Sequence, residues 1–562
     1  MNKRMVVIGG SAAGPKAAAR ARRMDEFAEI TLIQKSPDLS MASCGYPYYI
    51  GGFFDDRNML LSTPTGVVRD PKFYWNAKGI IAKVNTEAIR INRTEKNVEY
   101  KDLLTGESGV IEYDKLIIAT GAHPKLPPIE GIDLEGITTL QSMQDADYLR
   151  KIRDERKINK AVVIGGGLIG IETTEALNLA GIEITVIELL PQLLAFLDYE
   201  LAKLVENYVK TKANVITGNG VAKFIGENNK LTAVKLQNGT EIPCELAVVA
   251  IGVIPNTMLA KDAGLSIGKL GGILVNDYMQ TSDADIYAVG DCTEIKNIIT
   301  ENNVLAPYGD LANLEGRVAG ENAILGNKVK FPGTIQTGIC KVFDYHVGAT
   351  GLSECWAANA EKDVVTVVNA SPDKPGFMQG KLLVTKLVVE KKTGKILGAQ
   401  CVGPGDVSKQ IAIWATAIKG NLTVDDMVNA DLPYAPPFSL AIDHSIATAH
   451  IMQNKMRGLF KGISVKEVKE KIDKKEDIFL LDTRGADEYE AMRLGVGETQ
   501  IPIGMLRKRL SELPSDKNKE IITYCKISLR GYEAAVLLQA HGYKNVKLME
   551  GGLSAWYYPR EK

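Results

Sequence analysis

Two cysteines in this chain stand in settings that favour chemistry on sulfur. Cys44 lies in the segment 40–45, and no second cysteine lies two to five residues away from it. A local dithiol therefore cannot form at Cys44, and its redox partner has to be an external sulfur or an oxygen. Cys525 lies far along the chain, in a short loop that follows an apolar run.

The setting of Cys525 predicts a reactive thiol. Residues 521–524 form an apolar strand, and the loop 525–530 opens a helix that runs through Ala534 and Leu538. Free backbone N–H groups and the positive end of that helix lower the pKa of a thiol and stabilise a thiolate or persulfide anion. Arg530 and Lys526 add positive charge. The alternative is a buried structural cysteine.

The other cysteines show no disulfide framework, and the chain is expected to be cytoplasmic with reduced thiols. Four of them lie in or beside apolar runs, and Cys355 lies in a short polar stretch. All five are expected to be packed or inert: Cys244, Cys292, Cys340, Cys401 and Cys355.

The elements that position these cysteines include the same strand–turn–helix unit twice. An apolar strand runs into a glycine-rich turn and a helix at residues 5–14, and again at residues 161–170. Such turns let the backbone approach a pyrophosphate at the helix N-terminus, which is typical of dinucleotide-binding units. The candidate contacts are Gly9, Ser11 and Gly14 in the first turn and Gly165, Gly167 and Gly170 in the second.

The strand that follows each turn ends in a residue suited to an adenosine ribose. The first strand ends at Gln34, and a neutral amide can still accept and donate hydrogen bonds to a ribose hydroxyl. The second ends at Glu188, whose carboxylate would bind the ribose 2′-OH and repel a 2′-phosphate. The sequence therefore favours NADH over NADPH.

Two further segments carry a resemblance to a known family. A buried strand at 116–118 leads to Thr120 and Gly121, and another at 281–290 ends in Asp291. With the doubled units, these resemble the pyridine nucleotide–disulfide oxidoreductases over about residues 1–450. The resemblance implies FAD in the first unit, NADH in the second, and a dimerisation domain, with Asp291 on the ribityl chain of the flavin.

The lone Cys44 resembles the single-cysteine branch of that family. That branch includes water-forming NADH oxidases, NADH peroxidases, coenzyme A-disulfide reductases and NADH-dependent persulfide reductases. The oxidases and peroxidases place a catalytic histidine in the first glycine turn, where this chain has Ala12. The oxidase interpretation is therefore a minor alternative.

The resemblance to the coenzyme A-dependent members implies a set of ligands for coenzyme A. Arg20 and Arg23 are three residues apart, so they share one helix face and could grip anionic phosphates. The alternative is a solvated basic helix end. The full set is Lys16, Arg20, Arg23, Ser40 and Ser43.

Tyr434 matches a tyrosine that crosses the dimer in these enzymes and reaches the partner's cysteine. The coenzyme A-disulfide reductases use a second tyrosine before a Pro-Gly pair, and the segment 372–376 lacks it. This departure disfavours coenzyme A disulfide as the substrate and leaves smaller persulfides open.

Residues from about 462 to 556 resemble a single rhodanese domain. The resemblance implies that Cys525 is the sulfur-carrying residue, with Arg530 beside it. Ser528 stands where a glycine is frequent.

At 562 residues with a net charge of −1, the chain is too long for one core and shows no bulk attraction to nucleic acid or membrane. No metal site is expected. The predicted class is α/β: two Rossmann-like domains, an α+β dimerisation domain and an α/β rhodanese domain. The boundaries are 1–120 with 255–325 (FAD), 121–254 (NAD), 326–452 (dimerisation), 453–461 (linker) and 462–560 (rhodanese).

These observations predict a homodimeric, FAD-dependent NADH reductase of persulfide or polysulfide, acting on coenzyme A persulfide or related sulfane sulfur through Cys44. One alternative is a coenzyme A-disulfide reductase. An alternative of another class is a redox-sensing sulfur-carrier protein.

Overall fold

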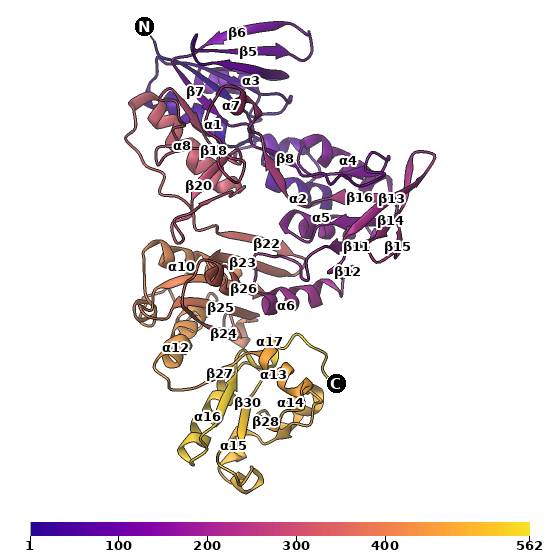
Figure 1. Cartoon of the computed structure of the whole chain (residues 1–562), viewed down its shortest axis with the longest axis vertical. Helices are drawn as coiled ribbons and strands as arrows, with labels where there is room; N and C mark the ends of the chain where they lie inside the picture. Colours follow the sequence, from indigo (N-terminus) through magenta and orange to yellow (C-terminus); the bar gives the residue numbers. More distant parts are fainter. Residues whose placement is uncertain (1, 562) are drawn as a thin grey trace. The chain divides into compact units, whose positions relative to one another are not determined.

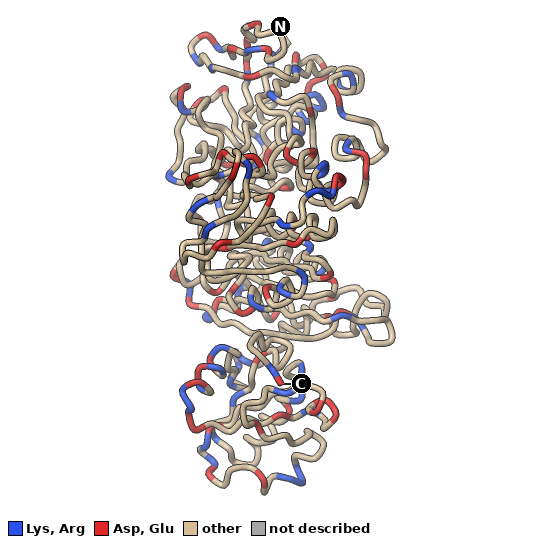
Figure 2. The backbone as a smooth tube through the Cα atoms, turned by 90° about the vertical axis from the view of Figure 1, so that its right-hand side faces the viewer, with Lys and Arg blue, Asp and Glu red and all other residues tan. Residues whose placement is uncertain are grey.

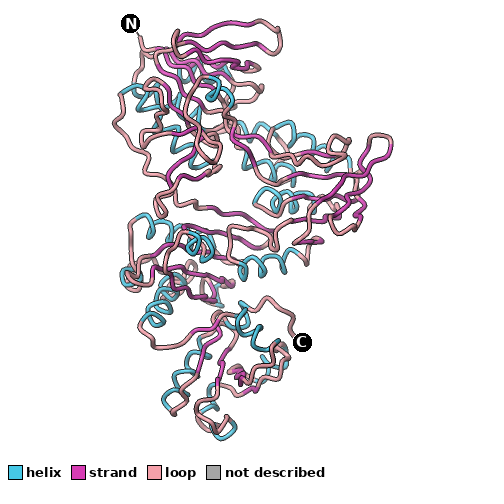
Figure 3. Tube along the Cα trace, viewed as in Figure 1, coloured by secondary structure: helices cyan, strands magenta, loops and turns pink. Residues whose placement is uncertain are grey.

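The computed structural model describes residues 2 to 561 and divides them into two compact units. Unit 1 contains the residues up to Leu189 together with Ile216–Gln336. Unit 2 contains Leu190–Val215 and the residues from Thr337 onward. Both units mix helices and strands (Figure 3), as predicted.

Unit 1 opens on a parallel sheet whose strands are short apolar runs. Such runs are expected where helices cover both faces of a parallel sheet. Figure 1 shows α1 (Ala13–Met24) and α8 (Gly309–Leu325) beside it. The strand order is β19 (Ile286–Ala288), β7 (Lys115–Ile118), β1 (Arg4–Ile8), β2 (Glu29–Ile33) and β3 (Ile80–Lys83).

Small residues bring α1 and α8 together. A Cβ added at Gly316 would lie 2.3 Å from the carbonyl oxygen of Ala13, and one at Gly320 would lie 2.2 Å from that of Ala17. Two glycines four residues apart share one helix face, so α8 presents a flat stripe to α1. The first turn of α1 therefore lies against the middle of α8.

A second parallel sheet repeats the device, which confirms the doubled unit seen in the sequence. Helix α5 (Leu168–Asn178) packs against two of its strands, and α4 (Met143–Glu155) lies in the same unit. The adjacent strands of this sheet are β11 (Glu183–Glu188), β10 (Lys160–Ile164), β16 (Leu246–Val249) and β9 (Ile137–Thr138). Two three-stranded antiparallel sheets accompany them. One contains β4 (Thr86–Asn92), β5 (Asn97–Asp102) and β6 (Ser108–Glu112), and the other contains β13 (Val221–Glu227), β14 (Lys230–Leu236) and β15 (Glu241–Pro243).

Unit 2 contains the antiparallel sheet of the expected α+β domain. Helix α10 (Val407–Lys419) packs against this sheet. Helix α12 (His444–Met456) packs against the same sheet. The strand order is β22 (Gly338–Val342), β23 (Tyr345–Gly351), β26 (Ile396–Gly403), β25 (Leu382–Glu390) and β24 (Val364–Pro372).

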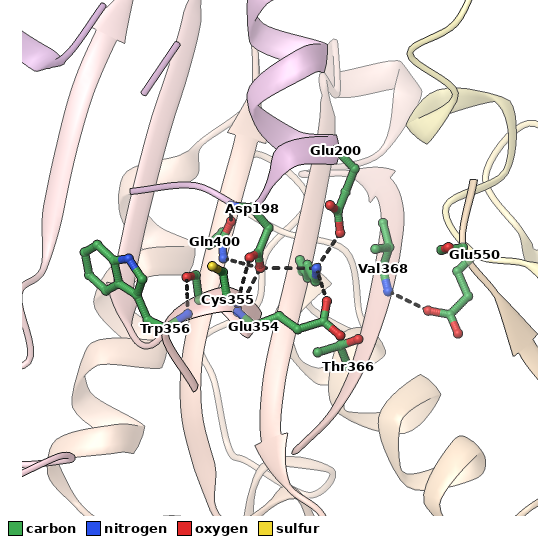
Figure 4. A network of polar contacts seen from close by, with 12 residues as sticks. Asp198, Glu200, Glu354, Cys355, Trp356, Thr366, Val368, Gln400 and Glu550 are labelled. Carbon is green, nitrogen blue, oxygen red and sulfur yellow. Dashed lines mark hydrogen bonds and ion pairs between the residues drawn. The ribbon is translucent and has the colours of Figure 1, made fainter. Parts of the chain in front are cut away.

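A buried lysine attaches the segment Leu190–Val215, with helix α6 (Tyr199–Val209), to this sheet. The side chain of Lys386 is 3% exposed, and its Nζ lies 3.1 Å from Asp198 Oδ2 and 2.5 Å from Glu354 Oε2. Asp198 also exchanges two hydrogen bonds with Gln400 (Figure 4). Part of the predicted NAD-binding segment 121–254 therefore belongs to unit 2.

Residues after α12 form the predicted α/β unit around a parallel sheet. Residues 453–456 of the predicted linker complete α12, and Phe460 is buried, so only a short turn separates the two parts. Helices α13 (Val465–Asp473) and α16 (Leu529–Ala540) pack on the sheet. The strand order is β27 (Gly462–Ile463), β31 (Val546–Met549), β30 (Glu520–Tyr524), β28 (Ile478–Asp482) and β29 (Thr499–Gln500).

Both charge signs are interspersed along the chain in each unit (Figure 2), in keeping with the near-zero net charge. Among residues 2 to 561, no helix combines the length and apolar composition that crossing a bilayer requires.

Candidate functional site

The first glycine turn has room for no side chain at two of its three predicted contacts. Gly9 has φ +110°, and a Cβ there would lie 2.0 Å from the carbonyl oxygen of Ala119. A Cβ at Gly14 would lie 1.9 Å from the carbonyl oxygen of Gly9. Ser11 is exposed at the mouth of the turn. Only glycine fits at these two positions, because backbone after a neighbouring strand crowds Gly9 and the backbone of the turn itself crowds Gly14.

The second glycine turn repeats this geometry. Gly165 has φ +108° with Ala250 2.3 Å from its added Cβ, and Gly170 packs on the carbonyl oxygen of Gly165. Nothing lies within 4 Å of a Cβ at Gly167. The bare backbone at Gly167 can therefore be approached closely by a pyrophosphate.

Gln34 and Glu188 occupy matching places in the two units. Gln34 Oε1 accepts a hydrogen bond from the N–H of Gly10 (2.8 Å), and Glu188 Oε2 accepts one from the N–H of Gly166 (2.6 Å). The amide nitrogen of Gln34 donates to Ser36. Each side chain therefore holds the glycine turn of its own unit.

Residues after two further strands meet near the first glycine turn. Thr120 Oγ1 donates to the carbonyl oxygen of Asn256 (2.6 Å), and the Asn256 side chain donates back to the carbonyl oxygen of Thr120 (2.8 Å). Gly121 has φ +65° and open space around it. Partial burial raises the pKa of Asp291. The donors and the bare glycine backbone in both turns fit dinucleotide phosphates and sugars.

Sequence reasoning missed Glu315, which lies on α8 behind Asp291. Its side chain is 1% exposed, and Oε2 accepts hydrogen bonds from the N–H of Gly290 (2.6 Å) and from Thr293. Burial raises the pKa of Glu315 to about 7. An acidic residue inside the otherwise small and apolar run of α8 was the available signal. Glu315 fixes the backbone that presents Asp291.

Cys44 lies in a 3-10 turn, η1 (Ser43–Gly45), just before α2 (Tyr46–Gly51). The residue is exposed, and a Cβ added at Gly309, the first residue of α8, would lie 3.5 Å from its Sγ. The thiol is thus held beside the helix N-terminus that also presents Asp310.

Loss of hydration raises the pKa of the Cys44 thiol, and the nearby carboxylates Glu172, Asp291 and Asp310 raise it further. The protein groups around Cys44 by themselves therefore favour the neutral thiol. Burial also raises the pKa of Glu172 to about 7, and a hydrogen bond with Tyr48 partly offsets this. Glu172 was missed in the sequence, although it lies two residues after Gly170 on α5.

The basic residues predicted to contact coenzyme A differ in exposure and in whether their charge is already paired. Arg20 forms an ion pair with Glu321 of α8, with Nε 2.9 Å from Oε2, and both side chains are largely buried. The charge of Arg20 is therefore neutralised inside the protein. Lys16 is half-buried and Arg23 is exposed at the end of α1. Arg23 contributes to lowering the pKa of Lys78, after burial of Lys78 itself.

The two predicted serines flank the turn that leads to Cys44. Ser40 has φ +54°, and its N–H donates to the carbonyl oxygen of Gly10 (2.7 Å). Its side chain bonds to Tyr74. Ser43 is exposed next to Cys44.

The loop that carries Cys525 closes tightly against the start of α16. Cys525 is fully buried, with 0% exposure. Ser528 caps the helix with φ +80°, a left-handed conformation that explains why glycine is frequent there. Its hydroxyl donates to the carbonyl oxygen of Met549 (3.3 Å).

Arg530 faces Cys525 and is oriented by a residue that sequence reasoning missed. Glu488, on α14 (Ala486–Ala491), accepts two hydrogen bonds from Arg530, at 2.6 and 2.8 Å. This contact lowers the pKa of Glu488 to about 2, and Glu488 followed by Cys525 raises that of Arg530. The fork geometry fixes the guanidinium beside the thiol.

Tyr434 is 54% exposed in the loop before α12, and Phe377, Phe438 and Ile442 are also exposed. Of the five cysteines expected to be packed or inert, four are buried and Cys355 is exposed. Within the described residues, no three His, Cys, Asp or Glu side chains gather closely enough to hold a metal.

Family models match three consecutive parts of the chain. Residues 3–306 match the pyridine nucleotide-disulphide oxidoreductase model, and residues 337–446 match the dimerisation domain of the same family. Residues 464–558 match a rhodanese-like domain.

Solved and characterised relatives align over most of the chain. A structure described as an NAD-dependent persulfide reductase from A. fulgidus is 42% identical, covers 98% of this chain and 100% of its own, and superposes with a TM-score of 0.93. Reduced Bacillus anthracis CoADR-RHD is 35% identical, covers 99% and 98%, and has a TM-score of 0.92. A NAD(P)H coenzyme A polysulfide/persulfide reductase from Pyrococcus horikoshii is 33% identical over 81% of this chain and 99% of its own. The chain therefore belongs to the pyridine nucleotide-disulphide oxidoreductase family and carries a rhodanese-like domain after its dimerisation domain.

Proposed function

We propose that this protein uses NADH to reduce sulfane sulfur carried by coenzyme A or another small thiol. The observation that carries the proposal is a lone, exposed Cys44 beside the N-terminus of α8, in the unit that holds both dinucleotide turns. The other cysteines of that unit, Cys244 and Cys292, are buried, so neither supplies an exposed second thiol. The similarity to persulfide reductases supports the same substrate class.

In the proposed reaction, the Cys44 thiol, whose neutral form the surrounding protein groups favour, loses its proton as its sulfur attacks a sulfur of the persulfide. The S–S bond breaks, and its electron pair leaves with the thiolate or the sulfide. Glu172 holds a proton near neutral pH that can neutralise this leaving group. FAD, when bound, supplies electron transfer between the nicotinamide and the sulfur. In sum, a persulfide, NADH and a proton become a thiol, hydrogen sulfide and NAD⁺.

The remaining roles follow from the same geometry. Ser11, Gln34, Thr120 and Asp291 would hold FAD, while Gly167 and Glu188 would hold NADH and disfavour a 2′-phosphate. Lys16 and Arg23, with Ser40 and Ser43, would bind coenzyme A, whereas Arg20 would support them through Glu321. Cys525 would carry sulfane sulfur beside Arg530. We further propose a cytoplasmic homodimer in which Tyr434 reaches the partner.

The test is NADH oxidation by the holoenzyme without oxygen, comparing coenzyme A persulfide, polysulfide and coenzyme A disulfide, with oxygen supplied separately. We expect the fastest turnover with persulfide, and sulfide release matching the NADH consumed. Faster turnover with the disulfide would favour a coenzyme A-disulfide reductase. Negligible turnover with every acceptor would favour a redox-sensing sulfur carrier.

A further inference from the structure

Glu550 is a buried carboxylate of the rhodanese-like domain whose polar partners lie outside that domain. It follows β31 and is 6% exposed. Its Oε2 accepts a hydrogen bond from the N–H of Val368 in β24 (3.1 Å), as Figure 4 shows. Its Oε1 lies 2.5 Å from Nζ of Lys455 in α12, and that ammonium also donates to the carbonyl oxygen of Thr366 (2.7 Å). Glu550 thus joins this domain to the dimerisation domain, through β24 and α12.

The two residues after Glu550 form a turn with neighbours on both sides. Gly551 and Gly552 have φ +71° and +55°. A Cβ at Gly551 would lie 2.9 Å from a methyl carbon of Val368, and one at Gly552 would lie 2.3 Å from the carbonyl oxygen of Cys525. The same turn therefore packs on β24 and on the loop that holds the reactive cysteine.

The short helix that follows, α17 (Gly552–Ala555), holds the Cys525 loop directly. The N–H of Leu553 donates to the carbonyl oxygen of Cys525 (3.0 Å), and that of Ser554 donates to the carbonyl oxygen of Lys526 (2.9 Å). With these carbonyls held by α17, the orientation of the intervening peptide group is set, and so is the direction of the N–H groups available to a persulfide.

A second contact holds the same region in place within unit 2. The side-chain amide of Asn207 in α6 donates to the carbonyl oxygen of Tyr557 (2.7 Å), and the rings of Tyr199 and Tyr557 pack edge to face. The residues on both sides of α17 are therefore attached to elements outside the rhodanese-like domain.

We infer that Glu550 is a positioning residue for Cys525. Its ion pair with Lys455 and its bond to Val368 fix α17 on β24, and α17 in turn orients the Cys525 loop. The sulfur-carrying centre is thus completed by the dimerisation domain. The inference rests on the proposed role of Cys525 as a carrier of sulfane sulfur.

Thiosulfate is a suitable probe, because the Cys525 thiolate attacks its outer sulfur, the S–S bond breaks, and sulfite leaves with the electron pair. The full-length holoenzyme would be compared with Glu550→Gln, which keeps an acceptor for the Val368 amide but loses the ion pair, and with Lys455→Met. Glu512→Gln is the matched control, since it removes an exposed ion pair with Arg509 in the same domain. The readouts are the rate of sulfur loading on the Cys525 peptide by mass spectrometry, and kcat and KM for sulfur transfer to cyanide.

We expect Glu550→Gln and Lys455→Met each to lower the loading rate and kcat by about tenfold through misorientation, with KM for thiosulfate unchanged. The double variant should be no slower than either single one, because both remove the same ion pair. The control should match the wild type. Wild-type loading by Glu550→Gln, additive losses, or an equal fall in NADH-dependent sulfide release by Cys44 would overturn the positioning role. No loading in the wild type would instead overturn the proposed function of Cys525, and this inference with it.

Discussion

Glu315→Gln should make the free energy of unfolding less sensitive to rising pH. Glu315 is buried and neutral in the folded state up to a pKa of about 7, whereas its ordinary value is 4.5. The folded state therefore binds this proton more tightly than the unfolded state does. Its contribution to stability is fully present below pH 4.5 and is lost as pH rises through about 7.

The size of the effect follows from the shift in pKa. Each unit corresponds to about 1.4 kcal/mol, so ionising Glu315 costs the folded wild type about 3 kcal/mol at neutral to alkaline pH. Glutamine keeps the acceptor for Gly290 and Thr293 but has no proton to lose. The variant and the wild type should therefore be similarly stable near pH 4, and the variant should be more stable by about 3 kcal/mol near pH 8.

The assay is urea unfolding of the holoenzyme across that pH range, for the wild type, Glu315→Gln and the control Glu107→Gln. Glu107 is exposed in the same unit, so Glu107→Gln replaces a carboxyl group by the same amide without removing a buried proton. Parallel stability curves for the wild type and Glu315→Gln would refute the reasoning, because they would show that Glu315 does not titrate differently on folding.

Four other substitutions test the proposed sites. Cys44→Ser should abolish NADH-dependent persulfide reduction while FAD stays bound, and normal sulfide release would contradict this. Glu188→Ala should lower kcat/KM for NADH by the equivalent of about 1–3 kcal/mol and reduce the preference of the enzyme for NADH over NADPH. Equal kcat/KM values for NADH and NADPH in the wild type would show that Glu188 does not select between the two nucleotides. Cys525→Ser should preserve reduction of free persulfide but remove sulfur from the loop peptide, and a fall as deep as that of Cys44→Ser would make the two cysteines one relay. Ser528→Gly should raise the free energy of unfolding by about 1 kcal/mol by relieving its left-handed backbone, as calorimetry would show; a decrease would mean that the bond to Met549 outweighs the strain.

The doubled dinucleotide device could be predicted from the sequence because its requirements are local. An apolar strand, a turn at positive φ and a close backbone approach each demand particular residue types. Gly9 and Gly165, which directly follow apolar strands, meet the second and third of these demands. The solitary state of Cys44 was equally plain, since spacing alone excludes a local dithiol. A reactive thiol at Cys525 was predicted for the same reason, from a cysteine between a strand and a helix, whereas the rhodanese-like character of the domain was predicted from family resemblance.

Only the tertiary structure decided which charged side chains can bind a ligand and which are already neutralised by an ion pair. Arg20 looked like a phosphate ligand until Glu321, 301 residues away, was found to pair with it. Glu315 and Glu172 acquire pKa values near 7 from burial, which no neighbour in the sequence reveals. Glu550 joins β31 to β24 across 182 residues. Hydrogen bonds and desolvation act over a few ångströms, so the strand–turn–helix units follow from local sequence, whereas ion pairs and perturbed pKa values depend on where the folded chain brings distant segments together.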